Sequence, residues 1–504
     1  MVLCRLAAFL LGGTILLSFA SSWAVNAQED SSSSSSVFSS DSSSSSSSSN
    51  NDILGLDGSG TTNPSKCFWH IMAKLSEQIK LPTRFTYRAV GSGTGIAEFL
   101  GKEVMDANGT EVTTYEAYND FGAGDIPIES ADRSEWITRG IEFVQLPFVL
   151  SAVSFFHNLP GVPASGSQGL NMTACLLSQI FQATITTWDH PDILAINPSL
   201  SVSADYPIYV GHRVKGSSST DAITHYLYAQ CPQTSEQPEG WPAELVGSAI
   251  EWHESTNECD GSDLMAECIQ SNEGSIGYMD AKHGYEALLT EIRVENGNGN
   301  FLTSVDAGVD GVRAAVDVDL VPLAADEDFS AMEFYNMPGE DTWPISLVSY
   351  IYIRKDLSFI QNPARRTLLK AFATSLFDPD YIDLCDRYGL IPVTSELRDL
   401  SLAGLDMLKL DASESDMWVF EKDTLPGLGQ GDRVISTRRQ SFALYEADHI
   451  ADEVDPMIED IRMLKLELAS LKAQGMQASN GCIVAKDMAL AVGALAGAFL
   501  LSFN

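Results

Sequence analysis

The residues best suited to chemistry in this sequence stand in four short segments rich in Gly, Ser and Thr. The segments are GSGTTNPS at 58–65, GSGTG at 91–95, FGAGD at 121–125 and RVKGSSSTD at 213–221. Glycine lets the backbone approach a ligand closely, and hydroxyl groups donate directed hydrogen bonds. The first turn of a helix adds N–H groups and a positive dipole end. This combination favours binding of a tetrahedral oxyanion.

Each segment is expected to join a strand to a helix. Around GSGTG these are the strand FTYRAV and the helix IAEFLGKEV, and around RVKGSSSTD the strand IYVGH and the helix AITHYLYAQ. A helix is also expected at 66–79, and Pro127 fits the start of another after FGAGD. The alternation of strands with helices predicts an α/β fold with parallel layers.

Ordinary structural roles remain open for the same residues, because turns and caps use the same residue types. Asp125 also fits a helix cap, Arg213 a surface ion pair, and 217–219 a flexible turn. Trp188 and Trp343 are expected to pack in the core and not to touch a ligand.

Length and charge narrow the classes of function. A chain of 504 residues is long enough for two packed cores plus extensions. The net charge of -38 argues against nucleic acid as a partner, since nucleic-acid binding requires a basic field. An anion can still bind, because each hydrogen bond to a charged group contributes about 1.5 to 3 kcal/mol and salt screens the surface field.

Both ends of the chain carry segments that are expected to lie outside the folded body. Residues 1–27 form a secretory signal peptide by their pattern, and 28–51 a disordered leader that is mostly serine. At the other end we expect a poorly constrained acidic extension at 406–456 and an amphipathic helix or stalk at 457–476. The apolar segment 477–504 predicts a membrane attachment, and a GPI-anchor signal, a transmembrane tail and a retained apolar tail stay open.

A signal peptide implies an oxidising compartment, where cysteines form disulfides and asparagines can be glycosylated. The sequence therefore predicts a secreted protein on the extracellular face of the cell membrane, with up to three disulfides whose pairing is open. The disulfide candidates are Cys67, Cys175, Cys231, Cys259, Cys268 and Cys385, and the glycosylation candidates are Asn108 in NGT and Asn171 in NMT.

Eight unrelated motifs occur in one order over residues 52 to 400. They are GSGTTNPS, YRAVGSGTGIAEF, NDFGAGDIPI, QLPFVLSAVSFFHNLPG, TTWDHPDILAINP, GHRVKGSSSTDAITHYL, GSIGYMDA and EDTWPISLVSYIYIRKD. This succession resembles the periplasmic phosphate-binding receptors of bacterial ABC transporters, the PstS-like members of the type II periplasmic-binding-protein family. The serine leader, the acidic extension and the apolar tail have no counterpart in the simple bacterial receptor.

The resemblance implies an α/β fold of two lobes with hinge strands between them. Lobe one would comprise 52–150 and 346–405, and lobe two 151–345, with crossings near LPFVLSAV and WPISLVSY. One inorganic phosphate ion would bind between the lobes without a cofactor, a metal or a catalytic residue. A membrane phosphate transporter is the partner that the resemblance implies.

The resemblance also assigns roles within the site. Arg213 would clamp two phosphate oxygens, and Asp125 would accept a proton that hydrogen phosphate can donate and sulfate cannot. The phosphate-binding set carried over from the family is Thr62, Asn63, Ser92, Asp125, Arg213, Ser217, Ser218 and Ser219. In the family pattern an aromatic residue stands in place of Asn63, a glycine in place of Ser218, and an aspartate that braces the arginine in place of Lys215.

Three other functions remain as alternatives. A binder of sulfate or molybdate would use the same loops, and Asp125 argues against it where the carboxylate faces the ligand. A secreted phosphatase could use a phosphate cradle, but the sequence has no HExxH or GxSxG motif and no dense Asp/His set. A structural surface protein could have kept the fold without the site.

Overall fold

The computed structural model describes the body of the chain from residue 53 onward, with gaps. The described residues are 53–105, 112–160, 162, 169–214, 216–316, 318–332, 334–410, 418–421 and 431–450, with single positions 454, 456, 457, 460 and 464. The predicted signal peptide, the leader, Asn108, Lys215, most of the stalk and the apolar tail lie outside this set. Those predictions stay untested.

One mixed ten-stranded sheet runs through the body, which confirms the α/β fold class. Its main path is β2 (Thr83–Ala89), β1 (Leu54–Gly60), β5 (Phe121–Gly124), β14 (Ser346–Arg354), β6 (Phe143–His157), β10 (Ser275–Asp280), β8 (Tyr209–Arg213) and β9 (Asn257–Cys259), while β11 (Thr290–Glu291) and β15 (Ile391–Pro392) also pair with β6. The pairs within β2-β1-β5 and within β10-β8-β9 are parallel. We call these two groups the first and second halves of the sheet.

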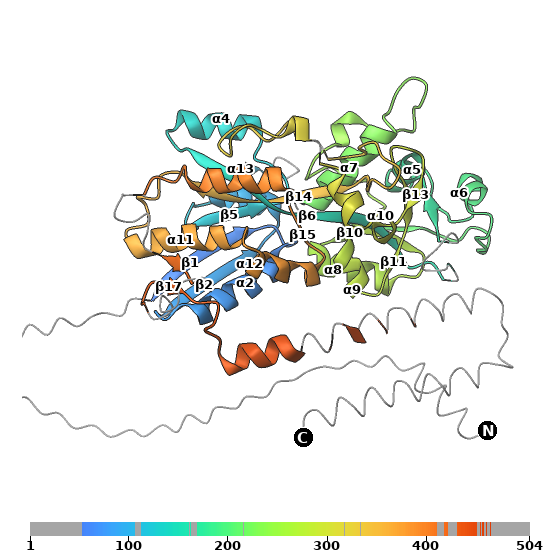
Figure 1. Ribbon diagram of the computed structural model, residues 1–504. Coiled ribbons are helices and arrows are strands. Elements are labelled where there is room, and N and C mark those ends of the chain that lie inside the picture. The colour runs from blue at the N-terminus through green and yellow to red at the C-terminus, as the bar shows by residue number, and fades with distance from the viewer. Residues whose placement is uncertain are drawn as a thin grey trace, which may run out of the picture. The chain divides into compact units, whose positions relative to one another are not determined.

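The two halves are joined by the long antiparallel pair of β6 and β14, which run side by side through the middle of the body in Figure 1. All 15 residues of β6 are buried, and so are all of β14 except Arg354. A near-continuous apolar run is what a strand covered on both faces requires. The two strands contain the LPFVLSAV and SLVSY segments, where the sequence predicted the crossings between lobes.

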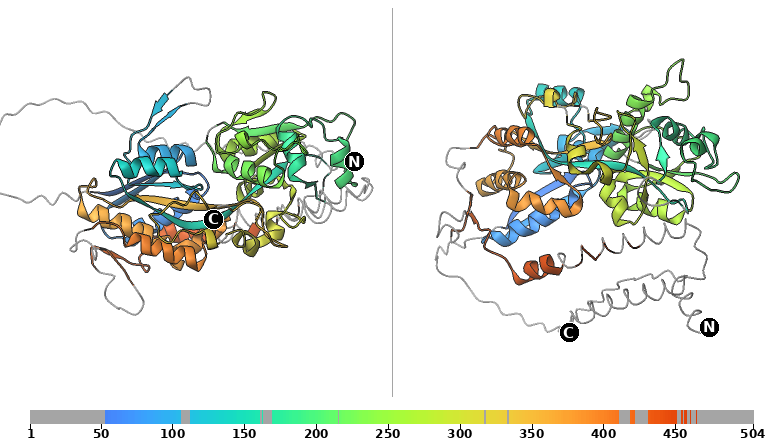
Figure 2. Two further views of the ribbon diagram at one scale, coloured as in Figure 1. Left: turned by 90° about the horizontal axis from the view of Figure 1, so that it is seen from above. Right: turned by 45° about the vertical axis from the view of Figure 1, so that its right-hand side comes forward.

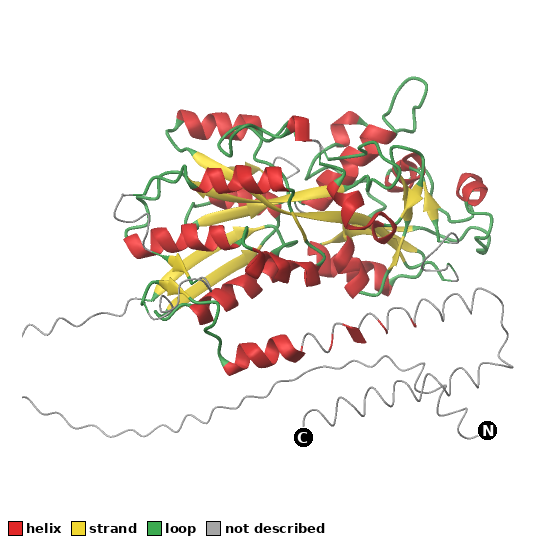
Figure 3. Cartoon of the chain, viewed as in Figure 1, coloured by secondary structure: helices red, strands yellow, loops and turns green. Residues whose placement is uncertain are grey.

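Helices lie on both sides of the sheet, as Figure 3 shows. The helices are α2 (Ser65–Gln78), α3 (Ser92–Leu100), α4 (Ser130–Thr138), α5 (Ala174–Phe181), α6 (Pro191–Ile196), α7 (Ser218–Gln230), α8 (Gly261–Ser271), α9 (Ala281–Glu286), α10 (Ser304–Arg313), α11 (Pro363–Ser375), α12 (Pro379–Ile382) and α13 (Ser395–Leu405), with 3-10 turns at Ala243–Leu245, Val318–Leu320 and Asp383–Tyr388. Among them, α3 packs on β5, α8 on β10 and α13 on β6.

Small sheets complete the body. They are β13 (Phe301–Leu302) with β12 (Arg293–Glu295) and β7 (Asn171–Met172), β3 (Glu103–Met105) with β4 (Val112–Thr114), and β16 (Val419–Phe420) with β17 (Val434–Ile435). The β3–β4 hairpin projects from the body in the left view of Figure 2. No described helix has the length and apolarity that a membrane span would need.

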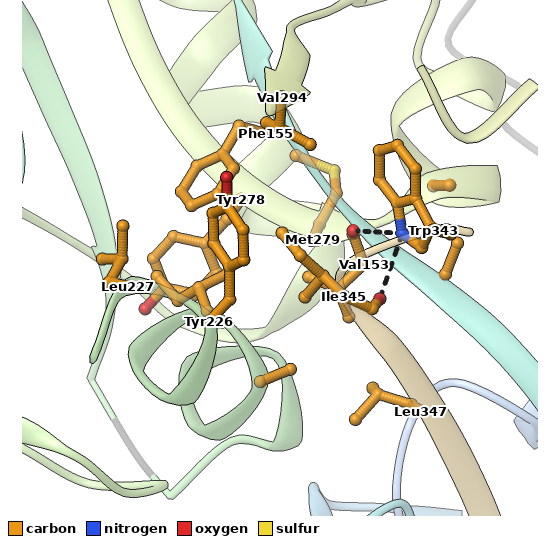
Figure 4. Close-up of a cluster of buried hydrophobic side chains, with 14 of the residues drawn as sticks. Val153, Phe155, Tyr226, Leu227, Tyr278, Met279, Val294, Trp343, Ile345 and Leu347 are labelled. Atoms are coloured by element: carbon orange, nitrogen blue, oxygen red, sulfur yellow. Dashed lines mark hydrogen bonds between the residues drawn. The ribbon is translucent and has the colours of Figure 1, made fainter. Parts of the chain in front are cut away.

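Two clusters of buried apolar side chains form the core. One contains Leu56, Phe68 and Phe372 around the first half of the sheet, and the other contains Phe155 and Tyr278 around the second. Figure 4 shows part of the second cluster, where the Trp343 indole donates to the carbonyl oxygens of Val153 and Ile345 at 3.2 and 3.1 Å. Trp188 and Trp343 are fully buried, as the sequence predicted.

The six candidate cysteines form three disulfides in the structure. The bridges are Cys67–Cys385, Cys175–Cys231 and Cys259–Cys268. The number that the sequence allowed is therefore reached, and the pairing, which the sequence left open, is assigned.

A few described residues of 406–456 pack on the body, although the sequence indicated a poorly constrained segment, while most described residues of 431–450 are exposed. Ile435 is fully buried, and the backbone N–H of Ser436 donates to the Gln78 carbonyl oxygen at 3.1 Å. The Trp418 indole donates to the Ala364 carbonyl oxygen at 3.0 Å. Acidic composition alone did not reveal these few apolar anchors.

Trp343→Phe is expected to lower the free energy of unfolding by about 2 kcal/mol, because two buried carbonyl groups lose the bond from the indole and the smaller ring leaves a gap. The Ile345 carbonyl oxygen keeps the bond from the Val153 N–H. Urea denaturation followed by circular dichroism measures the loss. Trp69→Phe is the control, since that side chain is 46% exposed and makes one bond, to the Tyr87 carbonyl oxygen. Equal losses in the two variants would contradict the importance of the buried indole.

Candidate functional site

The register of the sheet brings strand ends from both halves to the middle of β6. β5 ends at Gly124, which pairs with Tyr350 of β14, and Tyr350 pairs in turn with Pro147 of β6. From the other side, Asp280 at the end of β10 pairs with Val153 of β6. Because β10 runs antiparallel to β6 while β5 runs parallel to it, the carboxyl ends of β5 and β10 approach each other from opposite directions.

Asp125 follows β5 at this point and is the centre of a hydroxyl cluster. Its carboxylate accepts hydrogen bonds from Thr61, from Ser218 at 2.8 Å and from Ser349 at 2.6 Å. Its backbone N–H donates to the Ser92 hydroxyl at 3.2 Å. The donors come from the β1–α2 loop, the first turn of α7 and β14, so the cluster joins both halves of the sheet.

Burial raises the pKa of Asp125 above its ordinary value, while the hydroxyl donors Ser349, Thr61 and Ser218 lower it. The residue is only 3% exposed. An ionised carboxylate is an acceptor only, and each hydroxyl can both donate and accept. The cluster can therefore exchange its internal hydrogen bonds for bonds to a ligand that brings its own proton.

Glycines let the loops approach one another at backbone distance. A Cβ atom at Gly95 would lie 2.3 Å from the Cα of Gly60, a distance that real Cβ atoms do not reach. A Cβ at Gly93 would lie 3.4 Å from the Cα of Gly216, which belongs to the other half of the sheet. Gly60 and Gly95, in the first and second segments, are thus required for packing, whereas the approach of Gly93 to Gly216 is an ordinary van der Waals contact.

Arg213, the last residue of β8, lines a pocket of about 600 Å³ beside the hydroxyl cluster. The residue is 8% exposed. Its Nη1 donates to the Ser262 hydroxyl at 3.4 Å, and its backbone N–H donates to the Tyr278 hydroxyl at 3.2 Å. Thr62 and Gly91 also line the pocket.

Charged groups of both signs surround this pocket. Lys66 at the start of α2 and His283 of α9 line it, and so do Asp260 and Asp263 at the start of α8. Lys66 also bonds to Glu286 at 2.6 Å, which links α2 to α9. The pocket therefore offers cations for an anion, but it is not uniformly basic.

The structure brings most of the predicted residues together, but it divides them between two places. Ser92, Asp125 and Ser218 meet in the hydroxyl cluster, whereas Thr62 and Arg213 line the adjoining pocket. Asn63 is buried next to the cluster, where its side-chain amide donates to Ser151 at 2.7 Å. Ser217 is the N-cap residue of α7 without a side-chain cap bond, and Ser219 is buried in the first turn.

Some local expectations need correction. α3 begins at Ser92 and not at Ile96, so the Ser92 hydroxyl lies in the first turn. FGAG is the strand β5 and not a loop, and the next helix starts at Ser130 and not at Pro127. Asp125 caps no helix in this arrangement, because it precedes an extended connection to α4.

The sequence reasoning missed Thr61 and Ser349. Thr61 stands next to Thr62 in GSGTTNPS, and the spacing of the motif alone did not tell which hydroxyl faces Asp125. Ser349 is a polar residue within the apolar run SLVSYIYI, and this interruption was the available signal.

Comparison with known families agrees with this architecture. The model of the PBP superfamily domain matches residues 32–380. The chain belongs to the PBP superfamily.

Among its relatives, the PBP chain is similar to the phosphate-binding protein PstS of Haemophilus influenzae, with 26% identity over 68% of this chain and 90% of the relative. It is also similar to phosphate-binding protein PstS 3 of Mycobacterium tuberculosis, with 25% identity over 68% of this chain and 84% of the relative. A solved human phosphate-binding apolipoprotein has the same fold, with a TM-score of 0.50, 16% identity, and coverage of 70% of this chain and 98% of that chain.

Gly95→Ala in this PBP domain is expected to lower the free energy of unfolding by about 3 kcal/mol, because the added methyl group collides with the Gly60 backbone. Gly140→Ala is the control. Gly140 has a φ of 79°, and no atom lies within 4 Å of the place that an added Cβ would take, so only backbone strain of about 1 kcal/mol is expected. Thermal denaturation compares the two. A smaller loss for Gly95→Ala than for Gly140→Ala would refute the close approach of the loops.

Proposed function

We propose that this protein binds one inorganic phosphate ion where the two halves of the sheet meet. The ion would lie between the hydroxyl cluster of Asp125 and the guanidinium of Arg213. The similarity to proteins named as phosphate-binding supports the ligand class. The family membership supports binding between two parts of one chain.

The observation that carries the proposal is a buried carboxylate among hydroxyl groups at the site of an expected anion. A carboxylate repels an anion unless the anion donates a proton to it. Hydrogen phosphate has such a proton, whereas fully ionised sulfate would leave two like charges in contact. Asp125 with its hydroxyl donors therefore favours phosphate over sulfate.

Binding would rearrange the existing hydrogen bonds without a large change in the fold. The hydroxyls of Thr61, Ser218 and Ser349 now donate to Asp125. A hydroxyl rotates easily, so each can turn its O–H toward phosphate oxygen while the ligand donates its proton to the carboxylate. Arg213 would add charge-assisted bonds from the pocket side.

Because the donors come from both halves of the sheet, a bound phosphate would hold the halves together. Arg213 ends β8 of the second half and Ser218 starts the helix that follows it, while Thr61 follows β1 of the first half and Ser92 starts the helix after β2. A ligand that contacts both halves shifts the molecule toward its closed arrangement by the free energy of those contacts. The parts that would move relative to each other are the predicted lobes, 52–150 with 346–405 and 151–345.

We further propose that the protein is secreted and is tethered by its C-terminal tail, for phosphate scavenging, uptake or sensing at the cell surface. The signal-like residues 1–27 and the three disulfides support secretion. The apolar segment 477–504 supports the tether, as a GPI anchor or a transmembrane tail. Binding without turnover follows the names of the relatives, which are phosphate-binding proteins. Delivery to a membrane transporter is proposed from the resemblance to the periplasmic receptors.

Isothermal titration of the purified protein is expected to give one phosphate per chain, with much weaker heat from sulfate or molybdate. Arsenate is expected to bind as well, since it is a tetrahedral anion with a proton to donate. Clear binding of sulfate without binding of phosphate would reject the proposed ligand.

Asp125→Asn is expected to lower the preference for phosphate over sulfate by about tenfold or more, because an amide can donate to either anion. Competition titrations of the two anions give the ratio. Asp120→Asn is the control, since Asp120 is an equally buried carboxylate outside the hydroxyl cluster. Its carboxylate accepts a hydrogen bond from Arg365 at 2.6 Å. An unchanged ratio in Asp125→Asn would remove Asp125 from this role.

A further inference from the structure

A second buried carboxyl group stands at the strand end that approaches the carboxyl end of β5, and its side chain is used by none of the contacts described so far. Asp280 ends β10 and occupies the N-cap position of α9, but its side chain caps no backbone N–H. The residue is 4% exposed, and its Oδ1 atom is buried without a hydrogen-bond partner among the described residues. An unpaired buried carboxyl oxygen is costly, so it requires an explanation.

Asp280 is under the electrostatic influence of both groups that define the proposed anion site. Burial, and after it the charge of Asp125, raises the pKa of Asp280 to about 7, while the Arg213 guanidinium lowers that pKa. Two buried carboxyl groups and one guanidinium therefore influence one another before any ligand enters.

His283 faces Asp280 from α9, with Nδ1 3.7 Å from Oδ2, beyond hydrogen-bonding distance. Burial lowers the pKa of His283, so its imidazole does not neutralise Asp280 at neutral pH. The charge of Lys66 on α2 also lowers the pKa of His283, while the charges of Glu286 and Asp263 raise it. Lys66 is already paired with Glu286.

Asp280 lines a pocket of about 210 Å³ next to β6, which is distinct from the pocket that Arg213 lines. Four further titratable side chains line this pocket: Lys282, Tyr285, Asp386 and Tyr388. The pocket gives Asp280 a short route for exchanging a proton with solvent.

We propose that Asp280 is a second carboxyl group of the anion site and takes up a proton when phosphate binds. This inference rests on the proposed function and deepens it. With Asp125 and Asp280 both ionised, a phosphate dianion would face two buried negative charges beside the Arg213 guanidinium. Asp260 and Asp263 on the pocket wall add negative charge, and Lys66 is already paired with Glu286. A proton on Asp280 removes one of these charges, and the resulting O–H supplies a donor at the oxygen that now has no partner among the described residues.

The sign of the pH dependence follows from linkage. Phosphate disfavours the ionised form of Asp280, so its pKa is higher with the anion bound than without it. Affinity is then fully present below the pKa of the free site, about 7, and falls as the pH rises above that value. Phosphate itself also titrates in this range, so its contribution to the pH dependence of the affinity has to be removed by a comparison.

Comparison of the wild type with Asp280→Asn cancels the titration of the ligand, because the amide copies the neutral carboxyl at every pH. Calorimetric titrations with inorganic phosphate are run at pH 6, 7 and 8. The ratio of the wild-type Kd to the Asp280→Asn Kd is expected to be near one at pH 6 and to reach about tenfold at pH 8. Asp280→Ser, a smaller neutral donor, is a second variant in case the amide does not fit.

Glu286→Gln is the matched control, because it removes a carboxylate near the pocket where the side chain is 37% exposed. The ratio of the wild-type Kd to the Glu286→Gln Kd is expected to stay constant with pH. A constant ratio for both Asp280 variants would overturn the inference while leaving phosphate binding intact. If the wild type and the variants all fail to bind phosphate, the proposed function falls and the inference falls with it.

Discussion

The arrangement of the body depends on satisfying one buried carboxylate, that of Asp125. A charge removed from water is tolerated only when several donors surround it. Here the donors are Thr61, Ser218 and Ser349, which are 64, 93 and 224 residues away from Asp125 in the chain. All three contacts form together only when β1, β14 and the first turn of α7 are in place. The hydrogen bonds of this carboxylate therefore depend on the tertiary arrangement and not on one local element.

The geometry that makes this contact feasible comes from β6 and β14. A pair of long antiparallel strands lets one group of parallel strands attach along β14 and a second, oppositely directed group attach along β6. Their carboxyl ends then meet in the interior of the body instead of at one edge of the sheet. Anion-binding loops follow such strand ends in many α/β proteins, and here two sets face each other.

Sequence analysis predicted the architecture well because its signals were local. Four glycine-rich segments and apolar strands can each be read locally, and α2 differs from its predicted range by one residue at each end. The predicted starts of α3 and α4 were wrong by four and three residues. The other misses were tertiary. Whether Thr61 or Thr62 faces Asp125 depends on the path of the β1–α2 loop, and the importance of Ser349 and Asp280 depends on register across β6. No local pattern contains that information. Lys215, which departs from the family pattern, lies outside the described residues.

The Cys259–Cys268 bridge ties the end of β9 to α8, and between these cysteines stand Asp260, Ser262 and Asp263 on the wall of the larger pocket. Reduction of this disulfide would release the segment that forms the pocket wall, so ligand affinity is expected to depend on the redox state of the surroundings. In a chain made in a reducing cytosol, this wall would lose its covalent clip while the core stayed packed. Such a chain could look folded by spectroscopy and still hold its ligand loosely, so the oxidation state of a preparation is part of its functional description.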